Sequence, residues 1–411
     1  MASVTINGSG TQSVSITYDT AANYALAKQI ASQINAGVTA GTIVTTTDGT
    51  PPPLPAGALS GAYIQTVAGL VTLAPGYTSD NINIAGSGNA VVFSNSGATG
   101  QTILSDENTN LTFSATGGSG TVAAGGGNNT LHVNGPDNWS LNTGLGNDAI
   151  YDQGSGNTTI AAGGGTNSIQ LGSGKDWVTS TGDDNIQAGS GDVTVDASGG
   201  GSDYYQGGSG ALLFVGGSGG ATIIGGTGSD TFWGGSGTQV VHGGTAGHND
   251  LEAGAGAAAT LVGGGSGDKL YAQGATAQVL IAGSGNETLS ATFSSGNDSL
   301  SAGSGNDSIF GGTGADTFIG GTGHATISAD PNSSNVFAFI QGQAGGHDVV
   351  AGFTDASAAD IHIQLLGYAS TEGAAALASQ TTSGGAVSVT LSDQTKITFE
   401  NVTHLSSSNF V

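Results

Sequence analysis

Three aspartates recur at a spacing of nine residues in the stretch GNDSLSAGSGNDSIFGGTGADTFIGGTG, residues 296–323. Asp298, Asp307 and Asp316 each lie in a Gly-rich segment, and each is followed two positions later by an apolar residue. Carboxylates, together with carbonyl oxygens that no bulky side chain shields, are the hard oxygen donors that a calcium ion prefers. This stretch is therefore the strongest candidate for a metal site.

The next repeat keeps the pattern but lacks the charge. Ala325 stands where a fourth aspartate would fall, although Gly320, Gly321, Gly323 and Ile327 retain the rest of the repeat. Because residues 329–339 then break the period, we expect Ala325 to mark the end of the metal-binding series.

Further aspartates occupy comparable turns earlier in the chain, and the period of nine returns between residues 158 and 176 and between 203 and 239. Thr158, Asn167, Leu212, Ala221, Gln239 and Glu287 take the equivalent place in other repeats. An alternative stays open for the scattered aspartates, namely turns in which Asp makes only local hydrogen bonds. The further candidate ligands are Asp148, Asp176, Asp203 and Asp230, with Asp250 and Asp268 out of phase.

A short, fixed period with turn residues at each repeat predicts a solenoid. The glycines predict turns with positive φ, and three residues after each turn form a very short strand whose central side chain points inward. Two nine-residue units would make one coil. The expected inward residues are all apolar or aromatic: Ile150, Ile160, Ile169, Val178, Tyr205, Phe214, Ile223, Phe232, Val241, Leu300, Ile309, Phe318 and Ile327.

The segments on either side of the repeats have a different character. Alternation around Asn7 predicts two strands, and Asp19 or Thr20 is expected to cap a helix that carries Leu26, Ile30 and Ile34 on one face and stops at Gly37. The Pro-rich segment 49–57 predicts a stiff linker. We expect an N-terminal module at 1–75, a solenoid at 76–330 and a β-rich cap at 331–411.

Composition excludes several classes of partner and site. Only four lysines and no arginine oppose 29 acidic residues, and the net charge of −25 makes nucleic acid an unsuitable partner. The absence of cysteine excludes disulfides and thiolate metal sites. We expect no cleavable N-terminal signal peptide and no membrane span.

The segment GSGNDSIFGGTGADTFIGG resembles the nonapeptide repeat of RTX, or haemolysin-type calcium-binding, proteins, whose consensus GGxGxDxUx builds a parallel β-roll. The resemblance extends over about 130–330 and is most specific at 296–324. It implies an all-β parallel β-roll, or β-solenoid, with calcium held between turns by aspartates and carbonyls of repeats eighteen residues apart. Asp298 would then pair with Asp316, and Asp307 would face Ala325.

The C-terminal region carries a second resemblance. GGHDVVAGFTDASAADIHI and the terminal VSVTLSDQTKITFENVTHLSSSNFV are similar to the regions that follow the RTX roll in proteins exported by type I secretion. This implies an uncleaved export signal and the type I secretion apparatus as a partner. An ordinary β cap, which every solenoid needs, is the compatible alternative.

No catalytic motif stands out. The seven histidines are dispersed, and HExxH and GxSxG are absent, so we expect no enzyme. His347 beside Asp348 is interpreted as structural. Trp139, Trp177 and Trp233 are interpreted as packing or exposed residues, with a glycan-binding row as the alternative.

The sequence thus predicts a secreted calcium-binding structural protein, located outside the cell or at its surface, that folds on binding calcium. Its partner would be other copies of itself in a fibre or surface layer. The alternative is a monomeric RTX adhesin or biofilm-matrix protein that binds a cell-surface glycan or another surface partner.

Overall fold

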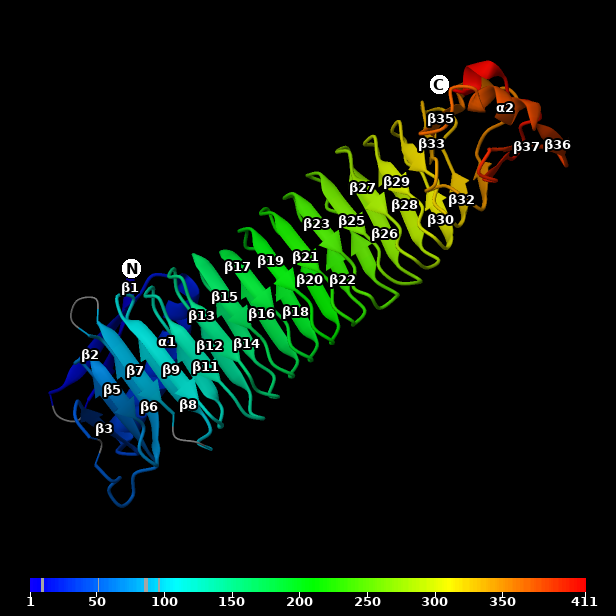
Figure 1. The fold of residues 1–411 in the computed structure, drawn as a ribbon. Coiled ribbons are helices and arrows are strands. Elements are labelled where there is room, and N and C mark those ends of the chain that lie inside the picture. The colour runs from blue at the N-terminus through cyan, green and yellow to red at the C-terminus, as the bar shows by residue number, and fades with distance from the viewer. Residues whose placement is uncertain (9–10, 51, 85–87, 95–96) are drawn as a thin grey trace. The chain divides into compact units, whose positions relative to one another are not determined.

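The computed structural model describes residues 1–8, 11–50, 52–84, 88–94 and 97–411. The chain divides into two compact units, Met1–Gly210 and Ala211–Val411. In both units short parallel strands follow one another in the coils of a β-solenoid (Figure 1). The predicted all-β class is confirmed.

The N-terminal module begins with an antiparallel hairpin of β1 (Ala2–Asn7) and β2 (Ser13–Tyr18). Residues 9 and 10 of the expected turn lie outside the described residues. Helix α1 (Ala21–Ala40) follows, and Thr20 caps it because its side chain accepts a hydrogen bond from the Asn23 amide at 3.2 Å. The expected hairpin and helix are both present.

The predicted helix stop at Gly37 is wrong. Helix α1 ends at Ala40, and Gly41, with φ of 70°, provides the left-handed C-cap. Gly37 lies inside the helix, where an added Cβ would come within 2.5 Å of the Ile43 side chain. Glycine at this position therefore allows close packing of the helix on β3 (Ile43–Thr47) rather than ending it.

In the first unit the remaining strands form two parallel sheets, one of which begins with β3 and β4. The first sheet continues from β3 through β4 (Ser60–Gln65), β6 (Tyr77–Ile82), β8 (Gln101–Ser105), β10 (Gly120–Ala123), β12 (Trp139–Asn142), β14 (Thr159–Ala162), β16 (Asp176–Ser180) and β18 (Val193–Asp196). The second sheet contains β5 (Gly69–Thr72), β7 (Asn89–Phe93), β9 (Asn110–Ala115), β11 (Thr130–Val133), β13 (Ala149–Asp152), β15 (Thr166–Gln170), β17 (Asp183–Gln187) and β19 (Asp203–Gln206).

The second unit repeats this arrangement and adds a C-terminal cap. One sheet contains β20 (Leu212–Val215), β22 (Thr231–Trp233), β24 (Asp250–Glu252), β26 (Lys269–Gly274), β28 (Thr288–Ser294), β30 (Asn306–Phe310), β32 (His324–Ser328), β34 (His347–Ala351), β38 (Lys396–Phe399), β37 (Ala386–Thr390) and β36 (Thr381–Ser383). The other contains β21 (Ala221–Ile224), β23 (Gln239–His242), β25 (Ala259–Val262), β27 (Val279–Ile281), β29 (Ser299–Ser301), β31 (Thr317–Ile319), β33 (Val336–Ile340) and β35 (His362–Leu366). The cap also holds η1 (Ala358–Asp360), α2 (Glu372–Ala378) and η2 (Ser407–Asn409).

Parallel pairing extends beyond the range expected for the solenoid. It begins at β3, where Ile43 pairs with Ser60, so strands on both sides of the Pro-rich segment belong to one sheet. It also continues past residue 330, because β32 pairs with β34 and β33 pairs with β35. Only β36, β37 and β38 form antiparallel pairs in the cap.

The core of each coil is the line of central strand residues. Neighbouring coils stack these side chains, and the rings of Phe318 and Phe337 lie 5.3 Å apart. The expected inward residues are at most 2% exposed, which confirms the prediction for Ile150, Ile160, Ile169, Val178, Tyr205, Phe214, Ile223, Phe232, Val241, Leu300, Ile309, Phe318 and Ile327.

Some turn glycines have the expected positive φ, such as Gly165, Gly201 and Gly267, but others are required for a different reason. Within residues 275–341, all of which are described, no glycine has positive φ. Instead, a Cβ on Gly323 would lie 1.9 Å from the carbonyl oxygen of Gly305 in the preceding coil. The repeat keeps glycine because stacked turns approach too closely for a side chain.

Candidate metal centre

Each turn of a coil places one residue beneath the backbone, two positions before the buried central residue of the strand that follows. We call this the inner turn position. Asp298, which precedes Leu300 in this way, is only 1% exposed. The candidate ligands that occupy inner turn positions are Asp148, Asp176, Asp203, Asp230, Asp268, Asp298, Asp307 and Asp316.

The carboxylates at these positions connect neighbouring coils. Asp298 Oδ1 accepts the amide N–H of Gln278 at 2.8 Å, and Asp316 Oδ1 accepts the amide N–H of Asp298 at 2.9 Å. Asp316 itself donates its amide to Asn335 Oδ1 at 2.9 Å. The structure therefore places Asp298 and Asp316 in successive coils, as the spacing of eighteen residues predicts.

The second carboxylate oxygen separates the candidates into two groups. Asp307 Oδ2 accepts the Gly303 amide at 2.9 Å and Asp316 Oδ2 accepts the Gly312 amide at 2.8 Å, so both carboxylates use both oxygens within the protein. Asp268 also uses both oxygens, because its Oδ2 accepts the Gly264 amide. In a second group this oxygen is buried and has no hydrogen-bond partner; its members are Asp148, Asp176, Asp184, Asp230, Asp298, Asp348 and, through Oε2, Glu287.

Burial makes the ionised form of these carboxylates unfavourable. It raises the pKa of Asp148, Asp176 and Asp230 to about 6 in each case, against the hydrogen bonds that lower it. Burial also raises the pKa of Asp298 and Asp316, and the charge of Asp298 raises that of Asp316 further. A bound cation would remove this penalty because it stabilises the ionised form.

Asp307 has a partner that the strict period of nine does not reveal. The strand register pairs Asp307 with Ala325, as expected. In the preceding coil, however, Glu287 takes the inner turn position and donates its amide to Asp307 Oδ1 at 3.0 Å. Burial, followed by the charge of Asp307, raises the pKa of Glu287 to about 7.

The series also continues beyond Ala325, which corrects the expected end point. Ala325 donates its amide to Asp348 Oδ1 at 2.9 Å. Asp348 is fully buried, its Oδ2 has no partner, and burial raises its pKa to about 7. One coil thus lacks the carboxylate, and the next coil supplies it again.

Asp250 does not occupy an inner turn position. It is half-buried in β24, while Asn249 lies beneath the turn and accepts the Asp230 amide at 2.8 Å. Asp268, which looked out of phase, accepts the Asn249 amide at 2.8 Å and belongs to the series. In the first unit, Asp203 Oδ1 accepts from Ser180 and from the amide of Asp184, which precedes it in the series.

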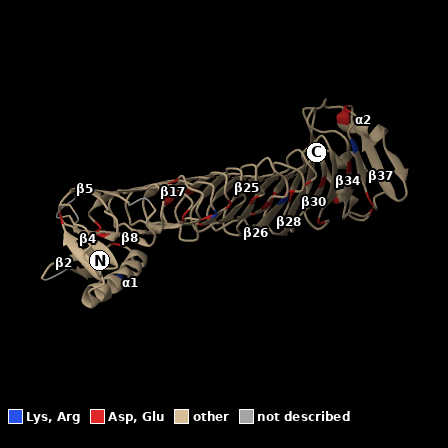
Figure 2. Ribbon diagram, turned by 90° about the horizontal axis from the view of Figure 1, so that it is seen from below, with Lys and Arg blue, Asp and Glu red and all other residues tan. Residues whose placement is uncertain are grey.

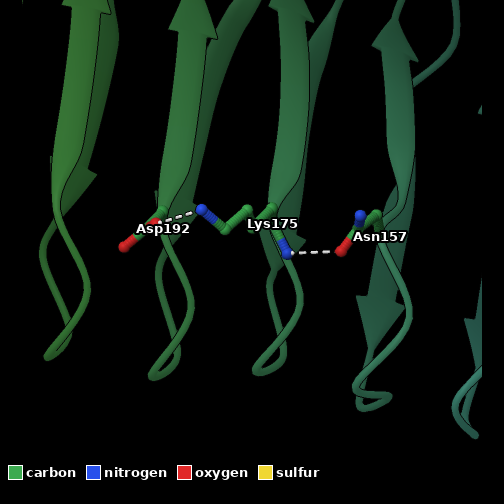
Figure 3. A network of polar contacts seen from close by, with 3 residues as sticks. All are labelled: Asn157, Lys175 and Asp192. Carbon is green, nitrogen blue, oxygen red and sulfur yellow. Dashed lines mark hydrogen bonds and ion pairs between the residues drawn. The ribbon is translucent and has the colours of Figure 1, made fainter.

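Asparagines at the outer side of the turns bond in the opposite direction along the chain. Asn297 Oδ1 accepts the amide of Ala315 in the following coil at 3.0 Å, whereas the adjacent Asp298 accepts from the preceding coil. An Asn-Asp dipeptide therefore holds both neighbouring coils. In Figure 3, Asn157 accepts the Lys175 amide at 2.9 Å in the same way.

Positive charge is scarce near the turns. Lysines are few and acidic residues recur along the solenoid coils (Figure 2). Lys175 pairs with Asp192 at 3.0 Å, and both side chains are exposed (Figure 3). Asp192 is not at an inner turn position, so this ion pair does not neutralise the buried carboxylates.

The donor set fits a hard cation. The partnerless carboxylate oxygens are buried in the turns, and oxygen atoms are the ligands that calcium takes at coordination numbers of about 6–8. No group of three or more acidic or histidine side chains that could hold a metal occurs among the described residues. Backbone carbonyls of the turns would be further oxygen donors for such an ion.

Sequence reasoning placed Glu287 at the equivalent position without counting it as a ligand, and it missed Asp348, Asp184 and the role of Asn249. A signal for them is present, because each lies two positions before a buried apolar residue: Leu289, Val350, Ile186 and Leu251, respectively. Counting back from the apolar residue keeps the phase where turns vary in length. Counting forward by nine residues loses the phase of the repeat wherever a turn is longer or shorter.

The fold and the site define a class: a parallel β-solenoid with carboxylates in stacked glycine turns. The family model of the RTX calcium-binding nonapeptide repeat matches residues 152–180, 178–211, 215–246 and 294–327. The chain contains four matches to this repeat, and these repeats indicate calcium binding. No curated protein and no solved structure matches the chain. Among the described residues, none of the helices has the length and apolar character that crossing a membrane requires.

Proposed function

We propose that this protein is a secreted structural protein that folds outside the cell on binding calcium and assembles with further copies into a fibre or surface layer. The proposal depends above all on the buried, partnerless carboxylate oxygens at the inner turn positions. Without a cation, the ionised form of these buried carboxylates is unfavourable. The net charge of −25 adds repulsion between them. RTX repeats are typical of secreted proteins, which supports the location.

Calcium supplies positive charge that offsets the repulsion between carboxylates of successive coils. The chain itself provides the coil geometry through its amide-to-carboxylate hydrogen bonds and its apolar core. Calcium in the cytosol lies far below the ~10⁻⁴ to 10⁻³ M affinities of extracellular sites. Because binding favours only the folded state, the chain would stay largely unfolded inside the cell and close its coils outside.

Circular dichroism of the purified chain in chelator and in millimolar calcium tests this step. We expect β structure to increase when calcium is added and to be lost when it is removed. The same spectrum in both solutions would refute calcium-coupled folding.

The C-terminal cap fits an export signal that is read before folding. Val411 donates its amide to the Ile363 carbonyl at 3.0 Å, and Asn409 is buried, so the final residues are docked in the folded unit. We propose that the type I secretion apparatus recognises this region while the chain is unfolded. Fusing residues 331–411 to a reporter protein should cause its export, and retention of the fusion would refute this role.

An open strand edge supports assembly. In the first unit β5 is the last strand of its sheet, and Leu70 on it is 63% exposed. Unpaired edges are ready templates for another chain. In the second unit the last strand, β35, is covered instead, because Ile363 bridges to Phe410. We propose that β5 contacts a second copy of this chain.

Electron microscopy before and after chelation tests assembly, with Leu70→Lys as the edge variant. Leu366→Lys on the covered strand β35 is the matched control. We expect calcium-dependent particles from the unaltered chain and from the control, and dispersed molecules from Leu70→Lys. If the unaltered chain stays monomeric at high concentration in millimolar calcium, assembly is excluded.

A monomeric adhesin is the second candidate function, favoured by exposed indole rings. Trp177 is 47% exposed and Trp233 is 49% exposed, each on the outer face of its unit, whereas Trp139 is buried. Exposed aromatic faces suit sugar rings through apolar contact. Binding to a glycan array that is lost in Trp177→Ala or Trp233→Ala, without particles in the microscope, would favour this function.

A further inference from the structure

Asp19 lies between β2 and α1, outside the segments that match the RTX repeat. It does not cap the helix, since Thr20 has that role. Its Oδ2 instead accepts the amide of Leu145 at 2.9 Å, across a sequence separation of 126 residues. A carboxylate of the N-terminal module thus reaches a solenoid turn within the same unit.

Neighbouring contacts hold the module against this turn. Asn23 Nδ2 donates to the carbonyls of Ala124 at 2.8 Å and Thr143 at 3.0 Å. Asp106, in the solenoid, accepts the Thr17 amide at 2.7 Å. The position of Asp19 beside residues 143–148 is therefore determined by several hydrogen bonds and not by one flexible side chain.

Two carboxylates at this place each keep one buried oxygen without a partner among the described residues. They are Asp19 Oδ1 and Asp148 Oδ2. Asp148 is only 3% exposed, and its other oxygen accepts the Asn129 amide at 2.7 Å. Burial raises the pKa of Asp148 to about 6, and the nearby charge of Asp19 contributes to the rise. Two carboxylates that affect each other through their charges therefore each keep one buried oxygen outside the hydrogen bonds of the turn.

Glycines let the turns approach the carboxylate of Asp19 closely. A Cβ on Gly144 would lie 2.7 Å from Asp19 Oδ1 and 2.6 Å from the carbonyl oxygen of Gly125. A Cβ on Gly126 would lie 2.3 Å from Asp19 Oδ2. A carboxylate oxygen of Asp19 and the Gly125 carbonyl oxygen therefore lie on the same side of Gly144, too close for any side chain there.

We propose that a calcium ion binds between Asp19 and Asp148 and fastens the N-terminal module to the solenoid. The donors are the carboxylates of Asp19 and Asp148 and the Gly125 carbonyl, and hard oxygens of this kind suit calcium. The site differs from the other turn sites because one ligand, Asp19, comes from the N-terminal module. Calcium here controls docking of the module as well as stacking of the coils.

Asp19→Asn and Asp148→Asn test the site in the full chain. Both changes keep an acceptor oxygen for the observed amide hydrogen bonds and remove the charge. Asp137→Asn is the matched control, because the exposed Asp137 also accepts one backbone amide, that of Gly118 at 3.0 Å. Equilibrium dialysis counts bound calcium, and hydrogen exchange reports protection of residues 11–47.

We expect each variant to bind one calcium ion fewer than the unaltered chain and to lose calcium-dependent protection of residues 11–47. The double variant should lose the same single ion, because the two residues serve one site. Asp137→Asn should bind the full number. If Asp19→Asn and Asp148→Asn both keep the full number of ions and the protection, the proposal is wrong.

Calcium-dependent exchange at residues 296–325, measured in the same samples, keeps this test separate from the proposed function. Protection there with none at residues 11–47 refutes the docking site alone. If calcium protects neither segment of the unaltered chain from exchange, calcium-coupled folding is refuted as well.

Discussion

Replacing Asp298 by asparagine should remove calcium-induced stability without removing the coil. The new side chain retains an oxygen that can accept the Gln278 amide, a hydrogen bond of 2.8 Å in the unaltered chain. The buried Oδ2 that has no partner becomes an amide nitrogen. In chelator we therefore expect stability that is unchanged or slightly higher, because a buried charge has been removed.

The magnitude follows from binding linkage. At a calcium concentration ten times the dissociation constant, one site stabilises the folded state by about 1.4 kcal/mol. For a unit of this size that corresponds to a change in melting temperature of roughly 3–6 °C. Differential scanning calorimetry with and without calcium should thus show a smaller calcium-induced shift in Asp298→Asn, by about this amount.

Asp360→Asn is the control, since Asp360 is an exposed aspartate in η1 that undergoes the same chemical change. It should retain the full calcium-induced shift. If Asp298→Asn also retains the full shift, the partnerless oxygen is not a calcium ligand and the reasoning from buried oxygens fails.

Three further outcomes are expected. Without calcium, the folded protein should become more stable as the pH falls from 7 to 4, because the pKa of the buried turn carboxylates is higher in the folded state than in the unfolded state. Calcium affinity should fall over the same pH range, because protonated carboxyl groups bind the ion poorly. Calorimetry and calcium titrations across this range check both signs, and a flat profile would contradict the carboxylates that titrate near pH 6, Asp148, Asp176, Asp203 and Asp230. Gly323→Ala should destabilise the second unit by about 1–3 kcal/mol in chemical denaturation, because its Cβ would overlap the Gly305 carbonyl oxygen, whereas Thr322→Ala should have little effect. Ala325→Asp should lower the melting temperature in chelator, through repulsion from the carboxylate of Asp348, and increase the shift produced by calcium; an unchanged shift would show that this coil cannot bind the ion.

Much of the fold could be predicted from local patterns. Apolar residues at the centre of each short strand, such as Leu300 and Ile309, determine which side chains face inward, and the repeat length determines that coils stack. Thr20 and the alternation in β1 and β2 likewise predict the N-terminal helix and hairpin. These features depend on residues close together in the chain.

The partners of the turn carboxylates could not be predicted in the same way. Coils differ in length, so Ala325 bonds to Asp348, twenty-three residues away, and Asp307 meets Glu287 twenty residues before it. The steric requirement for glycine in the turns could not be predicted from the sequence either. The contact between Gly323 and the Gly305 carbonyl exists only when one coil lies on the next.

The sequence alone therefore determines that this is an acidic repeat protein with inward apolar strands and oxygen-rich turns, because periodicity and composition are properties of the chain. Tertiary structure alone decides which carboxylate oxygens remain without a partner, as in Asp298, and which distant residue they meet, as in Asp19 and the turn before Asp148. The physical reason is that burial and hydrogen bonding depend on neighbouring coils, which the linear spacing of residues does not specify.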